Sequence, residues 1–330
     1  MTSQPASLPA SLPDRILADI GGTNARFALA SRDGIAASKI YPVRRYPRLT
    51  DALQAFIAEV GGGAVLRRAA LAVAGAKLDE TIRPTNSDWV CDRDEIAQLL
   101  GLARDQVTII NDFAAVAWAL NSLQPKDVTV LQAGQKSAEH PMLVMGPGTG
   151  LGMAALVPLV SPHGRGWTAV AAEAGHTRYA PANNDERKLV DQIARKHIFV
   201  TPENLISGPG LVNIYRALSA TPDLQVYEPA DVVARARAGE TRAHEALRNF
   251  AAIFGSFAST AALHYLALGG IYLTGGVLQK IGADFSVDRF LQRFNTNPLV
   301  SDMLQRMPVL RVETEIPAFA GLQFLLAQDD

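Results

Sequence analysis

Cysteine and an excess of charge of either sign are the first things that the sequence lacks. Cys91 is the only cysteine in the 330 residues, which excludes an intramolecular disulfide and any zinc site built from several cysteines. The 31 basic residues nearly balance the 32 acidic ones, so no large field of one sign would attract nucleic acid or an anionic membrane. We therefore expect a protein of a reducing, cytoplasmic setting that binds neither nucleic acid nor a membrane.

Long apolar runs and a targeting signal are missing as well. Residues 1–14 are rich in Pro and Ser but have neither the basic start nor the apolar run of a signal peptide, so we expect a flexible tail. The most apolar stretch, residues 250–270, is interrupted by glycine, serine, threonine and histidine. It predicts a buried helix and not a membrane span.

Two well-known nucleotide-binding patterns are also absent. No Gly-Lys dipeptide occurs in the chain, which excludes the Walker pattern of P-loop NTPases. The glycine-rich stretch GPGTGLG, residues 146–152, lacks the G-x-G-x-x-G spacing of dinucleotide-binding folds. A nucleotide site in this chain would have to be of another kind.

The chain does contain two Gly-Thr turns, each between apolar runs. The first follows Ile20 in ILADIGGTNARFALA and predicts a hairpin of two strands, and the second lies in residues 146–152. Backbone N–H groups of such turns can face phosphate oxygens, and glycine lets a phosphate come close. An ordinary tight hairpin and a flexible connection are the alternatives. The similarity between the two turns indicates that the chain has two related halves.

Asp19 stands just before the first turn. A carboxylate does not bind phosphate directly because both are anionic, but it could hold Mg²⁺, directly or through water. The metal would then supply the positive charge that these turns lack.

Strands alternate with helices along the chain, which predicts α/β architecture. The length suggests two domains, and we place the boundary near Asn121. Within the first domain we expect a helix over residues 49–60. A second helix is expected after Asp92, which with Glu95 forms an N-terminal capping pattern, and Gly101 ends it.

Asn111 and Asp112 stand where a predicted strand passes into a predicted helix. The simpler interpretation makes Asp112 the N-cap of that helix. The functional interpretation makes it a general base that takes the proton of a substrate hydroxyl as that hydroxyl attacks phosphorus. Asn111 could then bind a neighbouring hydroxyl.

Glu173 and His176 are three residues apart, beside a glycine. No H-E-x-x-H pattern surrounds them, so a metal site is not indicated, whereas a carboxylate and an imidazole together suit adjacent sugar hydroxyls. A structural histidine is the alternative. Glu203 has its own simple interpretation, a first-turn helix carboxylate after Pro202.

Six segments in this order resemble one family: LADIGGTNARFAL, IINDFAAVAWAL, GPGTGLGMAAL, EAGHTRYAP, ENLISGPGLVNIYRAL and IYLTGGV. They are similar to segments of the bacterial ATP-dependent glucokinases, in the sugar kinase, actin and Hsp70 superfamily. The resemblance runs from Arg15 to the C-terminus. It implies a two-domain actin-like ATPase (ribonuclease H-like) α/β fold with a cleft between the domains. Residues 15–121 with about 316–330 would form the small domain, and residues 122–315 the large one.

The resemblance also implies the role of each candidate residue. The first phosphate loop would be formed by Ala18, Asp19, Ile20, Gly21, Gly22 and Thr23, and the second by residues 146–152 with Gly148, Thr149 and Gly150. Gly275 and Gly276 would lie against the adenosine. Asp112 is expected to be the catalytic base, and glucose is expected to contact Asn111, Asp112, Glu173, His176 and Glu203. Asp19 would hold the Mg²⁺.

The implied activity is transfer of the γ-phosphoryl group of MgATP to the 6-hydroxyl of D-glucose, by a homodimer. Kinases of mannose, glucosamine or N-acetyl-mannosamine are the first alternative, since small differences at the sugar 2-position decide between them. A sugar-sensing regulator without catalysis is the second, although no helix-turn-helix is indicated before Arg15.

Two departures from the family pattern stand out. A single cysteine does not supply the zinc motif of the ROK sugar kinases, so the resemblance favours the zinc-free glucokinase group. Residues 74–89 form a longer segment than expected, which leaves their part in the sugar pocket open.

Overall fold

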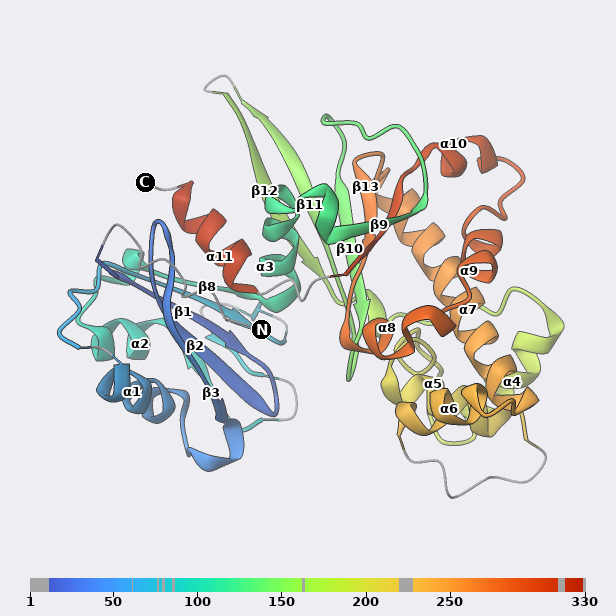
Figure 1. Cartoon of the computed structure of the whole chain (residues 1–330), viewed down its shortest axis with the longest axis horizontal. Helices are drawn as coiled ribbons and strands as arrows, with labels where there is room; N and C mark the ends of the chain where they lie inside the picture. The colour runs from blue at the N-terminus through green and yellow to red at the C-terminus, as the bar shows by residue number, and fades with distance from the viewer. Residues whose placement is uncertain are drawn as a thin grey trace, which may run out of the picture. The chain divides into compact units, whose positions relative to one another are not determined.

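The computed structural model describes residues 12–60, 62–75, 77–78, 81–84, 87–161, 164–219, 228–313 and 318–328. The chain divides into two compact units, Met1–Ser122 with Pro317–Asp330, called unit 1 here, and Leu123–Ile316, called unit 2 (Figure 1). Most of the predicted tail and the expected second boundary near residue 316 lie outside the described residues, as do parts of the long segment 74–89.

Unit 1 is built on a five-stranded sheet in the order β3-β2-β1-β4-β8. Its described strands are β1 (Arg15–Ile20), β2 (Asn24–Ser31), β3 (Gly34–Pro42), β4 (Arg68–Val73) and β8 (Val107–Asn111), with a small sheet of β5 (Lys77–Leu78), β6 (Thr81–Ile82) and β7 (Cys91–Asp92). Its described helices are α1 (Leu49–Val60), α2 (Arg93–Leu100), α3 (Asp112–Ala119) and α11 (Ala318–Ala327). Strands β1, β4 and β8 run parallel, while β2 is antiparallel to both of its neighbours, β1 and β3.

Local signals in the sequence set these elements. The hairpin of β1 and β2 and the helix α1 are where they were predicted. Asp92 is the N-cap of α2, and its side chain accepts the N–H groups of Asp94 and Glu95. Gly101 ends the helix at φ 66°, a left-handed conformation that glycine adopts without strain. The capping prediction is confirmed.

The sheet of unit 1 has a helix layer on each face, with α1 and α2 on one side and α3 and α11 on the other (Figure 1). Successive residues of a strand point to opposite faces. Ile16 and Ile20 of β1 therefore belong to the core under α1, with Phe56, whereas Leu17 belongs to the core under α11. Asp19, two residues after Leu17, shares the face of α3 and α11 by the same alternation.

Unit 2 repeats this plan in a six-stranded sheet, in the order β12-β11-β10-β13-β14-β9. Its described strands are β9 (Val128–Gln132), β10 (Met142–Pro147), β11 (Leu151–Ser161), β12 (Gly164–Ala172), β13 (Gly270–Leu273) and β14 (Val309–Val312). Strands β10, β13 and β14 are parallel, and β11 is antiparallel to both of its neighbours, β10 and β12, as β2 is to β1 and β3 in unit 1. The shared order and sense support the inference of two related halves.

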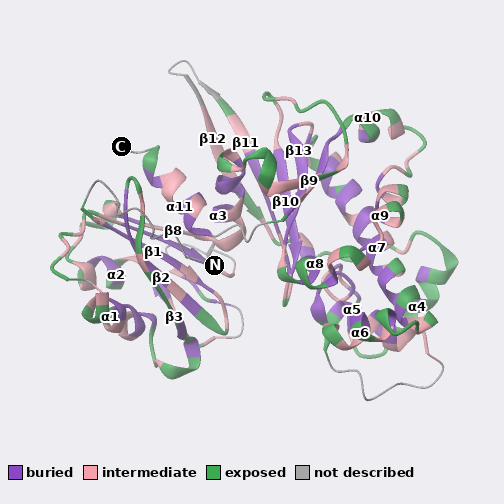
Figure 2. Ribbon diagram, in the orientation of Figure 1, coloured by how far each residue is buried: buried purple, intermediate pink, exposed green. Residues whose placement is uncertain are grey.

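Helices gather on one side of this sheet (Figure 1). They are α4 (Asn184–Ala194), α5 (Gly208–Ala217), α6 (Pro229–Arg237), α7 (Thr241–Tyr265), α8 (Gly276–Ile281), α9 (Val287–Phe294) and α10 (Ser301–Arg306). The long helix α7 forms much of the core, and buried residues run along it (Figure 2). It contains most of the apolar stretch that predicted a buried helix. Among the described helices, none is long and apolar enough to cross a membrane.

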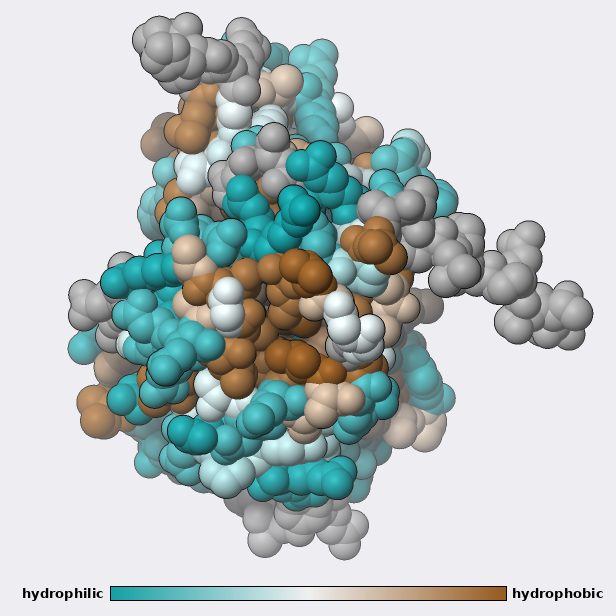
Figure 3. Space-filling view, turned by 90° about the vertical axis from the view of Figure 1, so that its left-hand side faces the viewer, coloured by the Kyte–Doolittle hydropathy of each residue, from teal (hydrophilic) through white to brown (hydrophobic). Residues whose placement is uncertain are grey.

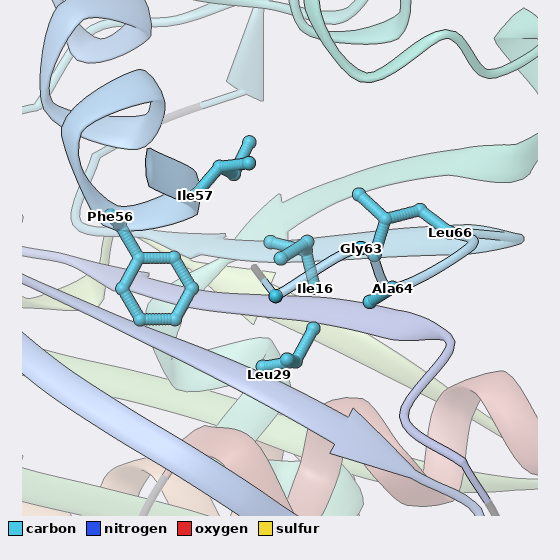
Figure 4. Close-up of a pocket in the computed structure, with 8 residues that line it drawn as sticks. Ile16, Leu29, Phe56, Ile57, Gly63, Ala64 and Leu66 are labelled. Atoms are coloured by element: carbon cyan, nitrogen blue, oxygen red, sulfur yellow. The ribbon is translucent and has the colours of Figure 1, made fainter. Parts of the chain in front are cut away.

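An apolar pocket of about 190 Å³ lies beside α1 in unit 1 (Figure 4). Phe56 and Ile57 of α1, Ile16 and Leu29 of the sheet, and Gly62, Gly63, Ala64 and Leu66 line it. The two glycines bring no side chain to this place, which explains the space. Hydrophobic residues also gather in the middle of the surface that Figure 3 presents, within a hydrophilic surround.

Cys91 is buried in β7, and burial raises the pKa of its thiol to about 12. Since the thiolate is the reactive form, only about 10⁻⁴ of the thiol is reactive at pH 8, against about one quarter for an unfolded chain. We expect 5,5′-dithiobis(2-nitrobenzoate) at pH 8 to label the native protein very slowly and the urea-unfolded chain at once. Rapid labelling of the native protein would contradict the burial of Cys91.

Candidate active site

The first predicted phosphate loop is a two-residue turn at the end of β1. The N–H of Gly21 donates to the carbonyl of Asn24 at 3.0 Å, so Gly22 and Thr23 form the tip. The carbonyl of Thr23 accepts the N–H of Val43 at 2.9 Å, which ties the tip to the end of β3. The amide of Gly21 is thus used within the turn, so of the predicted loop Gly22 and Thr23 at the tip stay the candidates for a phosphate contact.

Asp19 and Asp112 belong to the same edge of the unit 1 sheet. Asp19 is level with Ala72 of β4, which is level with Ile110 of β8. Neighbouring strands lie about 4.8 Å apart, so Asp19 and Ile110 are about 10 Å apart across the sheet. Asp112 follows two residues later, as the first residue of α3. Both carboxylates therefore lie near the carboxyl ends of parallel strands, where open α/β sheets bind their ligands.

The start of α3 differs from one prediction. The simpler interpretation, which made Asp112 the N-cap, is wrong: the N-cap is Asn111, whose Oδ1 accepts the N–H of Ala114 at 3.2 Å. Asp112 comes after the cap, and its Oδ1 accepts the N–H of Phe113 at 2.9 Å. Either residue type is a good cap, so residue preference does not decide between neighbours. The presence of a carboxylate at position 112 is therefore not explained by capping of α3.

Asn111 also anchors the chain that leaves β4. Its Nδ2 donates to the carbonyl of Gly75 at 3.0 Å. A side-chain amide has two donor and two acceptor positions, so these two bonds leave one of each. These positions are the ones with which Asn111 would bind a hydroxyl, and that role stays a prediction.

The second glycine loop lies next to the Gly275–Gly276 pair in unit 2. It joins β10 to β11, and β13, which pairs with β10 in parallel, ends just before Gly275. A Cβ on Gly146 would lie 2.8 Å from the carbonyl oxygen of Thr274, and one on Gly275 would lie 2.5 Å from that of Pro147. Gly275 has φ 104°, which side chains rarely adopt. Glycine is required here so that the two strand ends can approach each other.

Glu173 comes directly after β12, and His176 ends the short 3-10 turn that follows it, η5 (Ala174–His176). Strand β12 runs parallel to β10, because each is antiparallel to β11, so this turn shares the sheet edge of the glycine loop. Glu173 Oε2 lies 3.7 Å from His176 Nε2, and the two side chains are 53% and 60% exposed. The pair is therefore open to a ligand.

Glu203 is hydrogen-bonded both to the turn after β12 and to the end of the second glycine loop. Its N–H donates to the carbonyl of Gly175 at 3.0 Å, and its Oε2 accepts the N–H of Leu151 at 2.9 Å. The simpler interpretation of Glu203, a carboxylate in the first turn of a helix, is wrong. Helix α5 begins at Gly208 because Ser207 is its N-cap and accepts the N–H of Gly210 at 3.0 Å.

A buried polar network fixes the chain after His176, and sequence reasoning did not find it. Glu186 is 2% exposed and accepts Tyr179 Oη and the N–H of Ala182, each at 2.8 Å, and it pairs with Arg293. Burial opposes ionisation of Glu186, but Arg293 and the hydrogen bonds outweigh it and lower its pKa. Burial and Glu186 raise the pKa of Tyr179. A charged pair this buried is costly to break, so the segment is held firmly.

The residues present fit a magnesium nucleotide. Among the described residues, no three His, Cys, Asp or Glu side chains gather into a metal site. Mg²⁺ does not need such a cluster, because it keeps several waters and takes phosphate oxygens beside one or two carboxylates, a role that suits Asp19. A Cβ on Gly148 or Gly276 would meet no atom within 4 Å, so the space beside each Cα is open. The N–H of Gly148 itself donates to the carbonyl of Gly150 at 2.8 Å, and its carbonyl accepts the N–H of Gly208 at 2.9 Å.

The chain matches the family model described as Glucokinase over residues 16–329. The glucokinase of Chromobacterium violaceum is 36% identical over 97% of this chain and 91% of its own length. A solved glucokinase from an Antarctic psychrotroph is 30% identical, covers 96% of this chain and 100% of its own, and superposes with a TM-score of 0.83. This likeness confirms the predicted actin-like ATPase fold.

The bifunctional protein glk of Burkholderia thailandensis is 37% identical over 95% of this chain but only 48% of its own length. The chain thus spans about half the length of these bifunctional relatives. The two full-length likenesses and the match of the family model agree with the motifs from which the resemblance was inferred. The chain belongs to the glucokinase family.

Proposed function

We propose that the protein transfers the γ-phosphoryl group of MgATP to the 6-hydroxyl of D-glucose, giving glucose 6-phosphate and ADP. The observation that carries the proposal is the placement of Asp112. It is a carboxylate that does not cap its helix, at the carboxyl edge of parallel strands, on the edge that also bears Asp19. Membership of the glucokinase family supports the choice of nucleotide and sugar.

In this mechanism Asp112 accepts the proton of the 6-hydroxyl as its oxygen attacks phosphorus. MgATP would supply the phosphoryl group, and its metal would supply positive charge beside the phosphate oxygens. Asp19 would hold that metal, directly or through water. The N–H groups of Gly22 and Thr23 would stabilise the charge that develops during transfer.

The sugar would be gripped by the edge of unit 2 that bears Glu173, His176 and Glu203. Carboxylates accept hydroxyl protons and an imidazole can donate or accept, so the three match a ring with hydroxyls on adjacent carbons. Asn111 of unit 1 would contribute its remaining donor and acceptor. The second loop, with Gly148, Thr149 and Gly150, and the pair Gly275–Gly276 would hold the nucleotide.

A coupled assay of ADP release across sugars tests the proposal. D-Glucose, mannose, glucosamine and N-acetyl-mannosamine are compared at equal concentration, with Mg²⁺ and with excess chelator. We expect the highest kcat/KM with glucose and loss of turnover without Mg²⁺. A higher kcat/KM with another hexose would show that this hexose, and not glucose, is the preferred substrate. Absence of turnover with all four sugars would refute the kinase proposal.

We also propose that the enzyme works as a homodimer in the cytoplasm. The family resemblance supports the dimer, and the single cysteine, buried and with a raised pKa, fits a reducing compartment. Sedimentation equilibrium of the purified chain should give twice the mass of 35.3 kDa. A monomer at micromolar concentration would contradict the dimer.

A further inference from the structure

Gly150 of the second glycine loop faces a side chain that belongs to the predicted sugar site. A Cβ built on Gly150 would lie 2.5 Å from Oε2 and 3.2 Å from Cδ of Glu203. The next residue, Leu151, donates its N–H to the same Oε2 at 2.9 Å. The carboxylate of Glu203 therefore rests against the backbone of residues 150–151, in the place that a side chain on residue 150 would fill.

The other glycine of the Gly-Thr-Gly sequence has different surroundings. A Cβ on Gly148 would meet no atom within 4 Å. Neither residue has a backbone conformation that demands glycine, since neither belongs to the positive-φ glycines of the described residues. The two positions thus differ in what a methyl group would touch, and not in backbone strain.

We propose that Gly150 is a positioning residue for the sugar: its lack of a side chain, with the N–H of Leu151, sets the Glu203 carboxylate in the orientation that binds glucose. The inference rests on the proposed function, in which Glu203 binds the sugar. It reassigns Gly150 from the nucleotide, for which it was predicted, to the sugar. The loop would then have two roles: Gly148, beside whose Cα the space is open, stays predicted for the nucleotide, and Gly150 supports a sugar ligand.

The backbone around Glu203 is well placed to hold this arrangement. Its N–H is bonded to the carbonyl of Gly175 in the turn between Glu173 and His176, and its carbonyl accepts Ser207 Oγ at 2.7 Å. With the main chain fixed at both sides, only the side chain of Glu203 is left to move. A methyl group on residue 150 would therefore displace the carboxylate and break its bond to Leu151, while the fold would be kept.

The test compares Gly150→Ala with the matched change Gly148→Ala in the full chain. Gly150→Ala should raise the Kd for glucose, measured by calorimetry without nucleotide, by about 10-fold or more, because a hydrogen bond to a charged group is lost or misdirected. Its KM for ATP should change little. Gly148→Ala should do the reverse, with a raised KM for ATP and an unchanged Kd for glucose.

A double-mutant cycle separates positioning from a general disturbance of the loop. In the Glu203→Ala background there is no carboxylate to displace, so Gly150→Ala should have no further effect on the Kd for glucose. An equal effect in both backgrounds would overturn the proposal, as would an unchanged Kd or a rise confined to the KM for ATP. If the wild-type chain neither binds nor phosphorylates glucose, the proposed function itself fails. That result differs from a failure of the Gly150 proposal, in which the wild-type chain binds glucose and only the effect of Gly150→Ala is missing.

Discussion

Replacement of Asp112 by asparagine is expected to lower kcat for glucose phosphorylation by about 10²- to 10⁴-fold, the usual contribution of a general base. Asparagine has the same size and keeps an oxygen that can accept the N–H of Phe113, so the start of α3 should be preserved. It has no basic group to take the proton of the 6-hydroxyl. The Kd for glucose should stay within a few-fold of that of the wild type, because the contacts on unit 2 are untouched.

Asp105→Asn is the matched control, since Asp105 is an exposed carboxylate of the same unit outside the predicted site. Its kcat and its Kd for glucose should both equal those of the wild type. The comparison requires single-turnover or steady-state rates with saturating ATP and glucose, together with glucose binding by calorimetry. A near-normal kcat for Asp112→Asn would remove Asp112 from the role of base.

Gly321→Ala is expected to destabilise unit 1 by about 3 kcal/mol, at the high end for an added methylene in a packed core. A methyl group on Gly321 would overlap the carbonyl of Ala115, because α11 crosses α3 at very close range. Main-chain atoms do not yield as a flexible side chain does. The change should push α11 away from α3, and α3 begins with Asp112, so catalytic activity should fall as well.

Urea unfolding followed by tryptophan fluorescence measures this change. Trp118 of α3 reports on the contact, because its ring centroid lies 5.9 Å from that of Phe324 of α11. Gly166→Ala is the control, since the same methyl group there would meet no atom within 4 Å. An unfolding midpoint for Gly321→Ala equal to that of the wild type would contradict the packing of α11 on α3.

Elements with a complete local signal were predictable from the sequence. The cap at Asp92, the stop at Gly101 and the turn after β1 each depend on a few neighbouring residues. The start of α5 has such a signal too, a serine before Gly-Pro, whereas Pro202 is not directly followed by a helix. Capping preference alone did not separate Asn111 from Asp112, because each is a good cap.

Contacts between distant segments had no such signal. Nothing near Gly150 indicates that it faces Glu203, and nothing near Gly321 indicates that it faces Ala115. The sequence indicates that the loop is rich in glycine but does not indicate what each glycine faces, because a glycine next to a phosphate and a glycine next to a carboxylate look alike in a sequence. The pair of Glu186 and Arg293 was missed because its members are separated by most of unit 2.

The identity of the product tests the central claim most directly. Phosphorus and proton NMR of the reaction of ATP, Mg²⁺ and D-glucose with the wild-type chain should show glucose 6-phosphate and ADP formed in equal amounts. Asp112→Asn under the same conditions should form neither at a comparable rate. Formation of ADP with inorganic phosphate alone, phosphorylation at another hydroxyl, or no product from glucose would contradict the assignment of the protein as a glucokinase with Asp112 as its base.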